Sequence, residues 1–377
     1  MADPFEALTL EQLRDRRSVK WRMYDADVLP LWVAEMDLLP PPTVLDTLTT
    51  DLRVGDTGYP PLDNAYAEAF ARVATRWGWT VDVAATAVCA DVVSGIAHAI
   101  ELVTAPGDGV LLPSPVYPPL AFVPAERGRR VVPVAMTDAG RLDVAAIDVA
   151  LAADPGIRAL LLCSPHNPTG VLHTAEELRA VAAVATEHGV AVVVDEIHQL
   201  LVPAGAKFVP WLAVADEGIV VTSASKAYNL AGLKAGLMAF GPGEASRAAL
   251  ARLPQSVRMT PSTFGVRAHV AAWDGGEAWL AQVNAAIVER GRHLGELLAS
   301  ALPDVGYRPP QATYLAWLDC RRLGLGDDPA VAFLRRGRVA LNGGPSFGPG
   351  GEGFVRLNLA CSRAVLEDAV ARMASCV

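Results

Sequence analysis

The stretch that decides the fold of this chain is Val221–Gly236, with the sequence VTSASKAYNLAGLKAG. It begins at the end of an apolar run, Gly218–Val221, that is typical of a buried β-strand. Lys226 follows that run among small and hydroxyl-bearing residues, and no carboxylate lies next to it in the sequence. A buried ammonium without a counter-ion is costly, so a lysine at this position requires a chemical reason.

Burial in a weakly polar site lowers the pKa of a lysine, because the charged form loses its hydration. The unprotonated amine is the form that makes a Schiff base with a carbonyl group. We therefore interpret Lys226 as the residue that holds pyridoxal phosphate (PLP). Taken alone, a Ser-Ala-Ser-Lys run is more often a solvated loop, and the flanking residues decide between the two interpretations.

The flanking residues favour an anion site around this lysine. Ser223 and Ser225 offer hydroxyl groups, and Lys234 offers a positive charge, to a single anionic group. Gly232 and Gly236 allow the backbone to approach that group closely. The stretch therefore predicts a phosphate cradle beside a reactive amine.

From Val88 onward, apolar strands alternate with helices. Strands are predicted from Val110 and at three further runs, Ala159–Cys163, Val190–Asp195 and Gly218–Val221. Helices are predicted at 43–52, 63–77, 175–188 and 277–300. Continuous Val and Leu runs separated by helices indicate a mainly parallel sheet covered on both faces, so the fold class is α/β.

Each predicted strand ends in polar residues. Ligands of open α/β sheets bind at the carboxyl ends of the strands, where these residues would meet. We expect five side chains to converge there: Ser94, Tyr117, Asn167, Asp195 and Lys226. The segment 92–100 is predicted as a strand end, a Ser-Gly turn and a helix start, whose first N–H groups would form a second phosphate contact.

Two of these residues have further predicted roles. PLP withdraws electrons best when its pyridine nitrogen is protonated, which requires an anion beside that nitrogen. Asp195 is predicted to provide the anion, although a loop aspartate can also simply cap a helix. Asn167, in Asn-Pro-Thr-Gly, is predicted to bond the phenolic oxygen of the cofactor, although this motif alone is more often a turn.

Length and composition limit the class of protein. With 377 residues the chain is long enough for two domains, since single cores stop growing at about 250 to 300 residues. No apolar run approaches the roughly 18 residues of a membrane span, and the N-terminus lacks the pattern of a signal peptide. The net charge of -9 argues against nucleic acid or an anionic membrane as a partner. We therefore expect a cytoplasmic protein that acts on a small molecule.

The cysteines and histidines do not indicate a metal site. The 5 cysteines are widely spaced and lie mostly in apolar segments, which is typical of reduced thiols in the cytosol. Neither they nor the 7 histidines show metal-ligand spacing. We expect no metal.

The order of three motifs resembles the aminotransferase class I and II superfamily of fold-type-I PLP enzymes. These motifs are an Asn-Pro-Thr-Gly loop at Asn167, an aspartate after a buried strand at Asp195, and Ser-Ala-Ser-Lys ending at Lys226. In this superfamily a serine three residues before the lysine and a base eight residues after it bind the cofactor phosphate. Ser223 and Lys234 match these positions, with lysine where arginine is commoner.

The resemblance implies the fold and the domain organisation. The expected fold is PLP-dependent transferase-like, with a mainly parallel sheet in a large domain and a smaller α+β domain. We expect residues 48–275 to form the large PLP-binding domain. Residues 1–47 and 276–377 are expected to form the small domain together.

The resemblance also implies roles for residues outside the three motifs. Tyr117 is expected to stack on the pyridine ring, and the backbone N–H groups of Gly95 and Ile96 are expected to bind the phosphate. Tyr59 is expected to reach the phosphate of the neighbouring subunit. The expected assembly is therefore a homodimer with shared active sites.

Substrate contacts are implied in the same way. Arg356 is expected to pair with the α-carboxylate of an amino-acid substrate, a task that suits its planar guanidinium. Val33 and Ala34 are expected to line the substrate site.

Four segments together resemble one subgroup, the MalY/PatB-type cystathionine β-lyases. The segments are WVAEMD (32–37), SPHNPTG (164–170), DEIH (195–198) and FVRLNLA (354–360). His198 stands where aspartate-type aminotransferases usually have tyrosine, and it is expected either to contact the phenolic oxygen or to pack. The chain departs from the subgroup at Glu35, at Ala227-Tyr228 and at Asn342-Gly-Gly, which leaves the substrate open.

The subgroup implies a carbon–sulfur β-lyase that converts L-cystathionine or related S-substituted cysteines into a thiol, pyruvate and ammonia. Lys226 would remove the α-proton, and Tyr117 would protonate a poorer leaving group. One alternative is an aminotransferase of class I/II on the same scaffold. A second alternative is a non-catalytic or regulatory PLP-binding protein.

Overall fold

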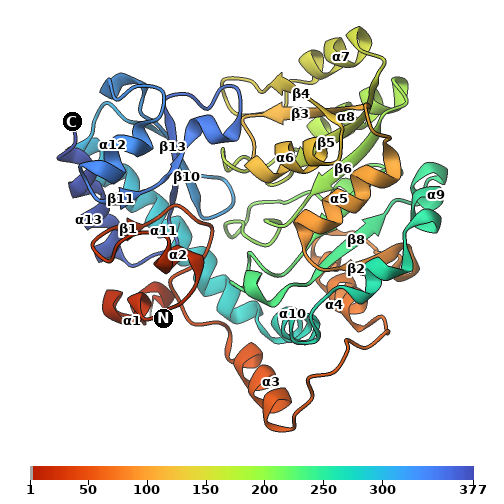
Figure 1. Cartoon of the computed structure of the whole chain (residues 1–377), viewed down its shortest axis with the longest axis horizontal. Coiled ribbons are helices and arrows are strands. Elements are labelled where there is room, and N and C mark those ends of the chain that lie inside the picture. The colour runs from red at the N-terminus through yellow and green to blue at the C-terminus, as the bar shows by residue number, and fades with distance from the viewer. Residues whose placement is uncertain (1–2) are drawn as a thin grey trace.

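A seven-stranded sheet forms the centre of the larger of two lobes in the computed structural model, which describes residues 3–377 (Figure 1). In order across the sheet, its strands are β2 (Thr86–Cys89), β8 (Gly236–Phe240), β7 (Ile219–Thr222), β6 (Ala191–Asp195), β5 (Ile157–Cys163), β3 (Gly109–Ser114) and β4 (Arg130–Ala135). The five strands from β7 to β4 are parallel to one another, and β8 runs antiparallel to both of its neighbours. The predicted α/β class with a mainly parallel sheet is confirmed.

Helices cover both faces of this sheet. Successive strand residues point to opposite faces, so Leu160 and Leu162 join one hydrophobic cluster and Leu161 joins the other. The first cluster is covered by α4 (Ala65–Ala74), α7 (Val144–Ala153), α8 (Ala175–Glu187) and α10 (Thr263–Gly275). The second is covered by α5 (Val92–Val103), α6 (Pro118–Glu126) and α9 (Glu244–Arg252). Burial on both faces explains why the strands are continuous apolar runs.

The smaller lobe combines the N-terminal segment with the last part of the chain (Figure 1). Its antiparallel sheet has the order β12 (Asn342–Gly343), β13 (Phe354–Asn358), β10 (Leu315–Asp319) and β9 (Gly306–Tyr307). A separate parallel pair joins β1 (Leu29–Pro30) to β11 (Val339–Ala340). The helices of this lobe are α1 (Leu10–Arg14), α2 (Val19–Arg22), α12 (Pro329–Arg335) and α13 (Arg363–Ala374).

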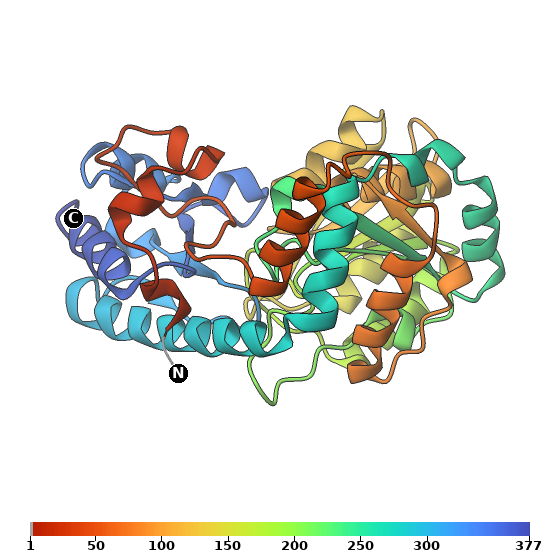
Figure 2. The same cartoon turned by 90° about the horizontal axis from the view of Figure 1, so that it is seen from below.

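One long helix, α11 (Glu277–Ala301), joins the two lobes and runs along one side of the molecule (Figure 2). Its Leu280 and Val283 belong to the core of the larger lobe, whereas its Leu294 and Leu298 belong to the core of the smaller one. None of the helices within residues 3–377 has both the length and the apolar character needed to cross a bilayer. The cytoplasmic location stays a prediction from the sequence.

The domain boundaries follow from the packing of whole helices. The expected boundary at residue 48 falls inside α3 (Pro42–Arg53), and α3 packs against α10 of the larger lobe. The other expected boundary, at residue 276, lies between the end of α10 and the start of α11. Because a helix packs as one unit, we propose that the large domain spans 42–275. The small domain then comprises 276–377 and the N-terminal segment, whose first two residues lie outside the described part.

The start of α5 differs from the prediction. The expected Ser94-Gly95 turn is wrong, because α5 begins at Val92. Asp91 caps the helix: its carboxylate accepts the Ser94 N–H at 2.8 Å, and the Ser94 hydroxyl accepts the Asp91 N–H at 3.2 Å. Gly95 therefore lies inside the helix and against the sheet. A Cβ at Gly95 would lie 2.6 Å from Val221 Cγ1, so glycine allows this close approach.

We predict that Gly95→Ala destabilises the protein. The added methyl group would overlap Val221 and push α5 away from the sheet, at a cost of about 1–3 kcal/mol. The free energy of unfolding in urea measures this. The matched control is Gly295→Ala in α11, where a Cβ would meet only the Tyr307 ring, at an ordinary 3.6 Å from Cε1 and 3.7 Å from Cδ1. Equal stability of the two variants would contradict the packing argument.

Candidate active site

The carboxyl ends of four parallel strands meet at a cavity of about 180 Å³. Tyr117 follows β3, Asn167 follows β5, Asp195 ends β6 and Lys226 follows β7, and all four line the cavity. The remaining lining residues are Ala34, Asp91, Val92, Val93, Ile197, His198, Ser225, Ala231, Lys234 and Ala235. The parallel sheet thus places four of the five expected side chains in one cavity, and Ser94 is the exception.

Lys226 reaches across the cavity toward the N-terminal segment. Its Nζ donates a hydrogen bond to the Ala34 carbonyl at 3.0 Å. Burial and the nearby Arg356 charge lower the pKa of Lys226 to about 8, whereas Asp195 acts in the opposite direction. Roughly a tenth of this amine is therefore unprotonated, and nucleophilic, at about pH 7.

Asp195 is buried beside this amine and has little compensation for its charge. Its Oδ1 accepts the Ile197 N–H at 3.0 Å. Burial raises the pKa of Asp195 to about 6, against the opposing effects of that hydrogen bond and of Lys226. An added positive charge in the cavity would therefore favour the ionised carboxylate.

One group of residues in the cavity lining has the properties of an anion site. Val92 and Val93 are the first two residues of α5, so their N–H groups have no acceptor within the helix. Ser225 and Lys234 line the same region. Lys234 Nζ also pairs with Asp91 Oδ2 at 2.7 Å, so a bound anion would compete with this carboxylate for the ammonium.

The helix residues predicted to bind phosphate are not the ones that reach the cavity. The Gly95 N–H donates to the Asp91 carbonyl at 2.9 Å, and the Ser94 hydroxyl bonds the same carbonyl at 3.0 Å. Ile96 is buried in the core between α5 and the sheet. The prediction is wrong for these three because the helix begins at Val92, which brings Val92 and Val93 to the cavity instead.

Ser223 also lies outside the cavity lining, contrary to the prediction. Its hydroxyl donates to the Ala235 carbonyl at 2.7 Å and accepts the Ser225 N–H at 3.1 Å. Both bonds hold the two sides of the lysine loop together. Ser223 therefore shapes the loop, and Ser225 is the serine that faces the cavity.

Tyr59 lies on the loop between α3 and α4, outside the lining of the cavity of its own chain. Its side chain is 93% exposed, and it does not line the cavity. Within one chain it therefore contributes nothing to the site.

Arg356, on β13, is buried and reaches the edge of the site. Its Nη1 donates to Asn167 Oδ1 at 3.0 Å and its Nη2 donates to the Trp32 carbonyl at 3.0 Å. Its Nε is buried and has no partner within residues 3–377. Burial lowers the pKa of Arg356 to about 10, so the guanidinium remains charged at neutral pH. Val33, predicted to line the substrate site, is absent from the lining, but its neighbour Ala34 is present.

His198 lines the cavity and is neutral. Burial lowers the pKa of His198 to about 3, and the charges of Lys226 and Arg356 add to this effect. Its Nδ1 is buried and has no partner in the described chain. Its ring packs edge-on against Tyr314, with centroids 6.3 Å apart. The two expected roles of His198, contact with the cofactor and packing, thus both fit its position.

Four residues at the site were missed by sequence reasoning: Asp91, Asn229, Tyr314 and Asn358. Asp91 precedes an apolar helical run, so its capping role had a local signal. Asn229 lies three residues after Lys226 but contacts Met36, far away in the sequence. Tyr314 and Asn358 likewise contact the N-terminal segment, and no local pattern indicates these contacts.

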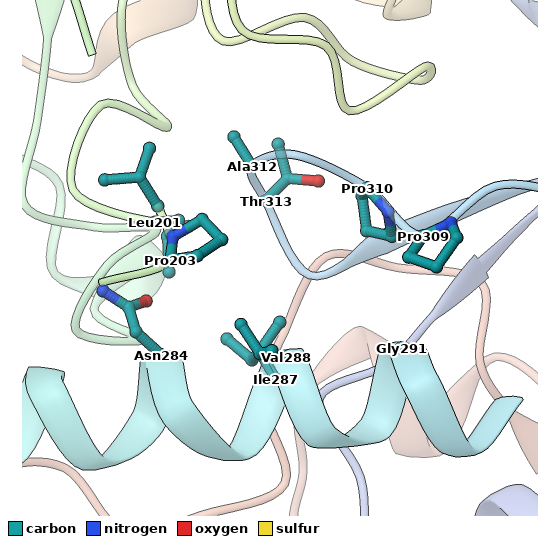
Figure 3. A pocket seen from close by; sticks show the side chains of 11 residues that line it. Leu201, Pro203, Asn284, Ile287, Val288, Gly291, Pro309, Pro310, Ala312 and Thr313 are labelled. Carbon is teal, nitrogen blue, oxygen red and sulfur yellow. The ribbon is translucent and has the colours of Figure 1, made fainter. Parts of the chain in front are cut away.

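A second, smaller cavity lies between α11 and the loops at 201–203 and 309–313 (Figure 3). Its lining is mostly apolar, with Asn284 and Thr313 as the polar side chains and no titratable group. In residues 3–377, no three His, Cys, Asp or Glu side chains are grouped so that they could hold a metal ion. The chemistry-bearing side chains are therefore concentrated in the first cavity.

Comparison with known proteins supports one family. A Mycobacterium tuberculosis (strain CDC 1551 / Oshkosh) protein, which has the provisional name cystathionine beta-lyase, is 47% identical, and the alignment covers 98% of this chain and 97% of that protein. Cystathionine beta-lyase PatB of Bacillus subtilis (strain 168) is 34% identical, with 96% and 97% covered.

A solved structure agrees. The Corynebacterium diphtheriae protein described provisionally as a PLP-dependent beta-cystathionase has a TM-score of 0.92 and 34% identity, and the match covers 98% of each chain. The predicted PLP-dependent transferase-like fold is therefore confirmed. The family description aminotransferase class I and II matches residues 26–373. The chain belongs to the aminotransferase class I and II family.

Proposed function

We propose that the chain is a PLP-dependent carbon–sulfur β-lyase. It would cleave L-cystathionine or related S-substituted cysteines to a thiol, pyruvate and ammonia. The observation that carries this proposal is the Lys226 amine, with its pKa lowered to about 8, in a cavity that also presents Asp195 and a helix N-terminus. The relatives named as cystathionine β-lyases support the choice of reaction.

The donor set fits PLP. The N–H groups of Val92 and Val93, with Ser225 and Lys234, suit a phosphate dianion. Asp195, in the same cavity, suits a cationic ring nitrogen, which would favour its ionised form. When bound, PLP supplies an aldehyde for the lysine amine and a ring that accepts the electron pair released at the substrate α-carbon.

Three further residues would orient the cofactor. Asn167 Oδ1 already accepts a hydrogen bond from Arg356, so its amide N–H₂ group would face the phenolic oxygen. Tyr117 would stack on the ring, and neutral His198 would contact the ring edge. These contacts favour one fixed orientation of the cofactor ring. That orientation matters because it decides which bond at the substrate α-carbon is aligned for cleavage.

The substrate would be handled by Arg356, Lys226 and Tyr117. Arg356 would pair with the α-carboxylate, since its buried guanidinium stays charged and uses only two of its five N–H groups in hydrogen bonds. Lys226 would take the α-proton, and its lowered pKa keeps the amine available as a base. Burial raises the pKa of Tyr117, which keeps its proton for a poor leaving group, whereas a thiolate needs little acid help.

We predict that the purified protein with PLP releases pyruvate and homocysteine from L-cystathionine without a keto-acid acceptor. Lys226→Arg keeps the positive charge but cannot act as a neutral amine, so we expect at least about a thousandfold loss of kcat. Pyruvate formation and the thiol product measure this. Borohydride reduction with labelled PLP provides the control, since only Lys226 should become labelled in the parent protein.

The first alternative is an aminotransferase, which uses the same amine and the same cofactor contacts. A strict requirement for a keto-acid acceptor, with no thiol released, would favour it over the lyase. The second alternative is a PLP-binding protein without turnover. Normal PLP absorbance with no product from cystathionine, cystine or S-alkyl-cysteines would favour this regulatory role.

The charge of Arg356 generates a pH prediction. Because that charge lowers the pKa of Lys226, Arg356→Met should raise the pKa toward its ordinary value. Cyanate reacts with the neutral amine, so carbamylation of Lys226 in cofactor-free protein should have its midpoint at higher pH in this variant. Site-resolved peptide masses measure the midpoint. Arg356→Lys keeps the charge and is the control; a midpoint equally raised there would contradict the electrostatic cause.

We also propose a homodimer in which Tyr59 completes the site of the partner subunit. Its side chain is 93% exposed, and Leu52, Val54 and Leu62 on the same segment are also exposed. A highly exposed aromatic side chain on a segment with further exposed apolar residues is typical of an interface. Such an arrangement would bring the Tyr59 hydroxyl to a phosphate bound in the other subunit.

Hybrid dimers test this arrangement. We predict that Tyr59→Ala and Lys226→Ala are each poorly active alone, and that the two variants unfolded, mixed and refolded together regain activity. A hybrid dimer contains one site with both Lys226 and the tyrosine from the partner. Pyruvate release by the purified, refolded mixture measures the regained activity, and each variant refolded alone is the control. No gain in a mixture that contains hybrid dimers would contradict the shared site.

A further inference from the structure

The irregular segment Leu31–Leu38, which follows β1 of the smaller lobe and precedes α3 of the larger one, contacts the Lys226 amine. We call it the bridging segment. Its backbone carbonyls accept hydrogen bonds from side chains of both lobes, including two cations of the site, Lys226 and Arg356. A segment held in this way can fix where the amine lies.

From the smaller lobe, Asn358 holds the bridging segment on both sides of Ala34. Its Nδ2 donates to the carbonyls of Val33 at 2.8 Å and Glu35 at 2.7 Å. Its Oδ1 accepts the Ala360 N–H at 2.8 Å, which fixes the orientation of the amide. One buried side chain thus brackets the Ala34 peptide.

From the larger lobe, Asn229 holds the next residue. Its Oδ1 accepts the Met36 N–H at 2.8 Å, and its Nδ2 donates to the Met36 carbonyl at 2.9 Å. The pair of bonds is specific for an amide, because it needs one donor and one acceptor side by side. Asn229 has a φ of 59°, a left-handed conformation that asparagine tolerates better than most residues.

These contacts fix the Ala34 carbonyl, which accepts two hydrogen bonds. Lys226 Nζ and Tyr314 Oη both donate to it at 3.0 Å. Two donors occupy both lone pairs of a carbonyl oxygen, so the amine has one defined position relative to the bridging segment. When the cofactor engages the amine, Tyr314, Asn229 and Asn358 keep that acceptor in place.

We propose that Asn229 is a positioning residue for the Lys226 amine: through Met36 it holds the Ala34 carbonyl opposite Nζ. When a substrate has displaced the Lys226 amine, the amine returns to the Ala34 carbonyl. From that position it takes the α-proton of the substrate. The inference rests on the proposed function, because it concerns the amine proposed to hold PLP. Asn229 belongs to the same loop as Lys226, so it links the amine and its acceptor directly.

The test is Asn229→Gly, which removes both amide bonds and leaves the left-handed backbone unstrained. We expect kcat for pyruvate release to fall at least about tenfold, since displacement of a reacting group by about 1 Å costs up to a hundredfold. In cofactor-free protein, the pH midpoint of Lys226 carbamylation by cyanate should shift downward. The reason is that a loosened Ala34 carbonyl no longer stabilises the ammonium form.

The matched control is Asn284→Ala. Asn284 also donates one amide bond to a backbone carbonyl, that of Leu200 at 2.9 Å, but it lies on α11 at the second cavity (Figure 3). We expect neither kcat nor the Lys226 midpoint to change in this control. Should Asn229→Gly fail to fold, Asn358→Ala loosens the same segment from the other lobe and should shift the midpoint in the same direction.

An unchanged Lys226 midpoint in Asn229→Gly would overturn the proposal even if activity fell, because Asn229 would then serve only the fold. Unchanged activity and midpoint would overturn it as well. The carbamylation measurement needs no cofactor and no substrate. It therefore decides the role of Asn229 separately from the β-lyase assay, whose failure in the parent protein would count against the proposed function instead.

Discussion

The hydrogen bond from Lys226 Nζ to the Ala34 carbonyl is the interaction on which the rest of the site depends. The amine has no carboxylate bonded to it, and burial together with Arg356 lowers its pKa. A neutral carbonyl can orient such an amine without raising its pKa as strongly as a carboxylate would. The amine is therefore held in position and still available as a nucleophile and base.

The direction of the parallel strands brings the other side chains of the site together. Strands that run in the same direction bring their carboxyl ends to one edge, so Asn167, Asp195 and Lys226 meet although they are far apart in the chain. The same edge lies next to the N-terminus of α5, where backbone N–H groups point at the cavity. An anion site and a reactive amine thus arise in one small cavity.

The two lobes are coupled to the site through elements that belong to both. The helix α11 contributes to both hydrophobic cores, and the bridging segment bonds Arg356 and Asn358 on one side and Lys226 and Asn229 on the other. A movement of the smaller lobe would therefore move the carbonyls that hold both cations. The buried ion pair of Lys20 and Asp37, at 2.6 Å, further ties the N-terminal helix α2 to this segment.

The sequence by itself determined the alternation of strands and helices and the residues at the strand ends, because apolar periodicity and strand direction are local properties. It also determined Lys226, Asn167 and Asp195 as neighbours at one edge. The helix start at Val92 was missed although the Asp91 cap is a local signal. Only the tertiary structure decided that Val92 and Val93 line the cavity, since this depends on where the sheet places the start of α5. The sequence likewise could not predict that Asn229 and Asn358 bond the bridging segment. Hydrogen bonds between residues separated by 193 or more positions leave no periodic pattern in the chain.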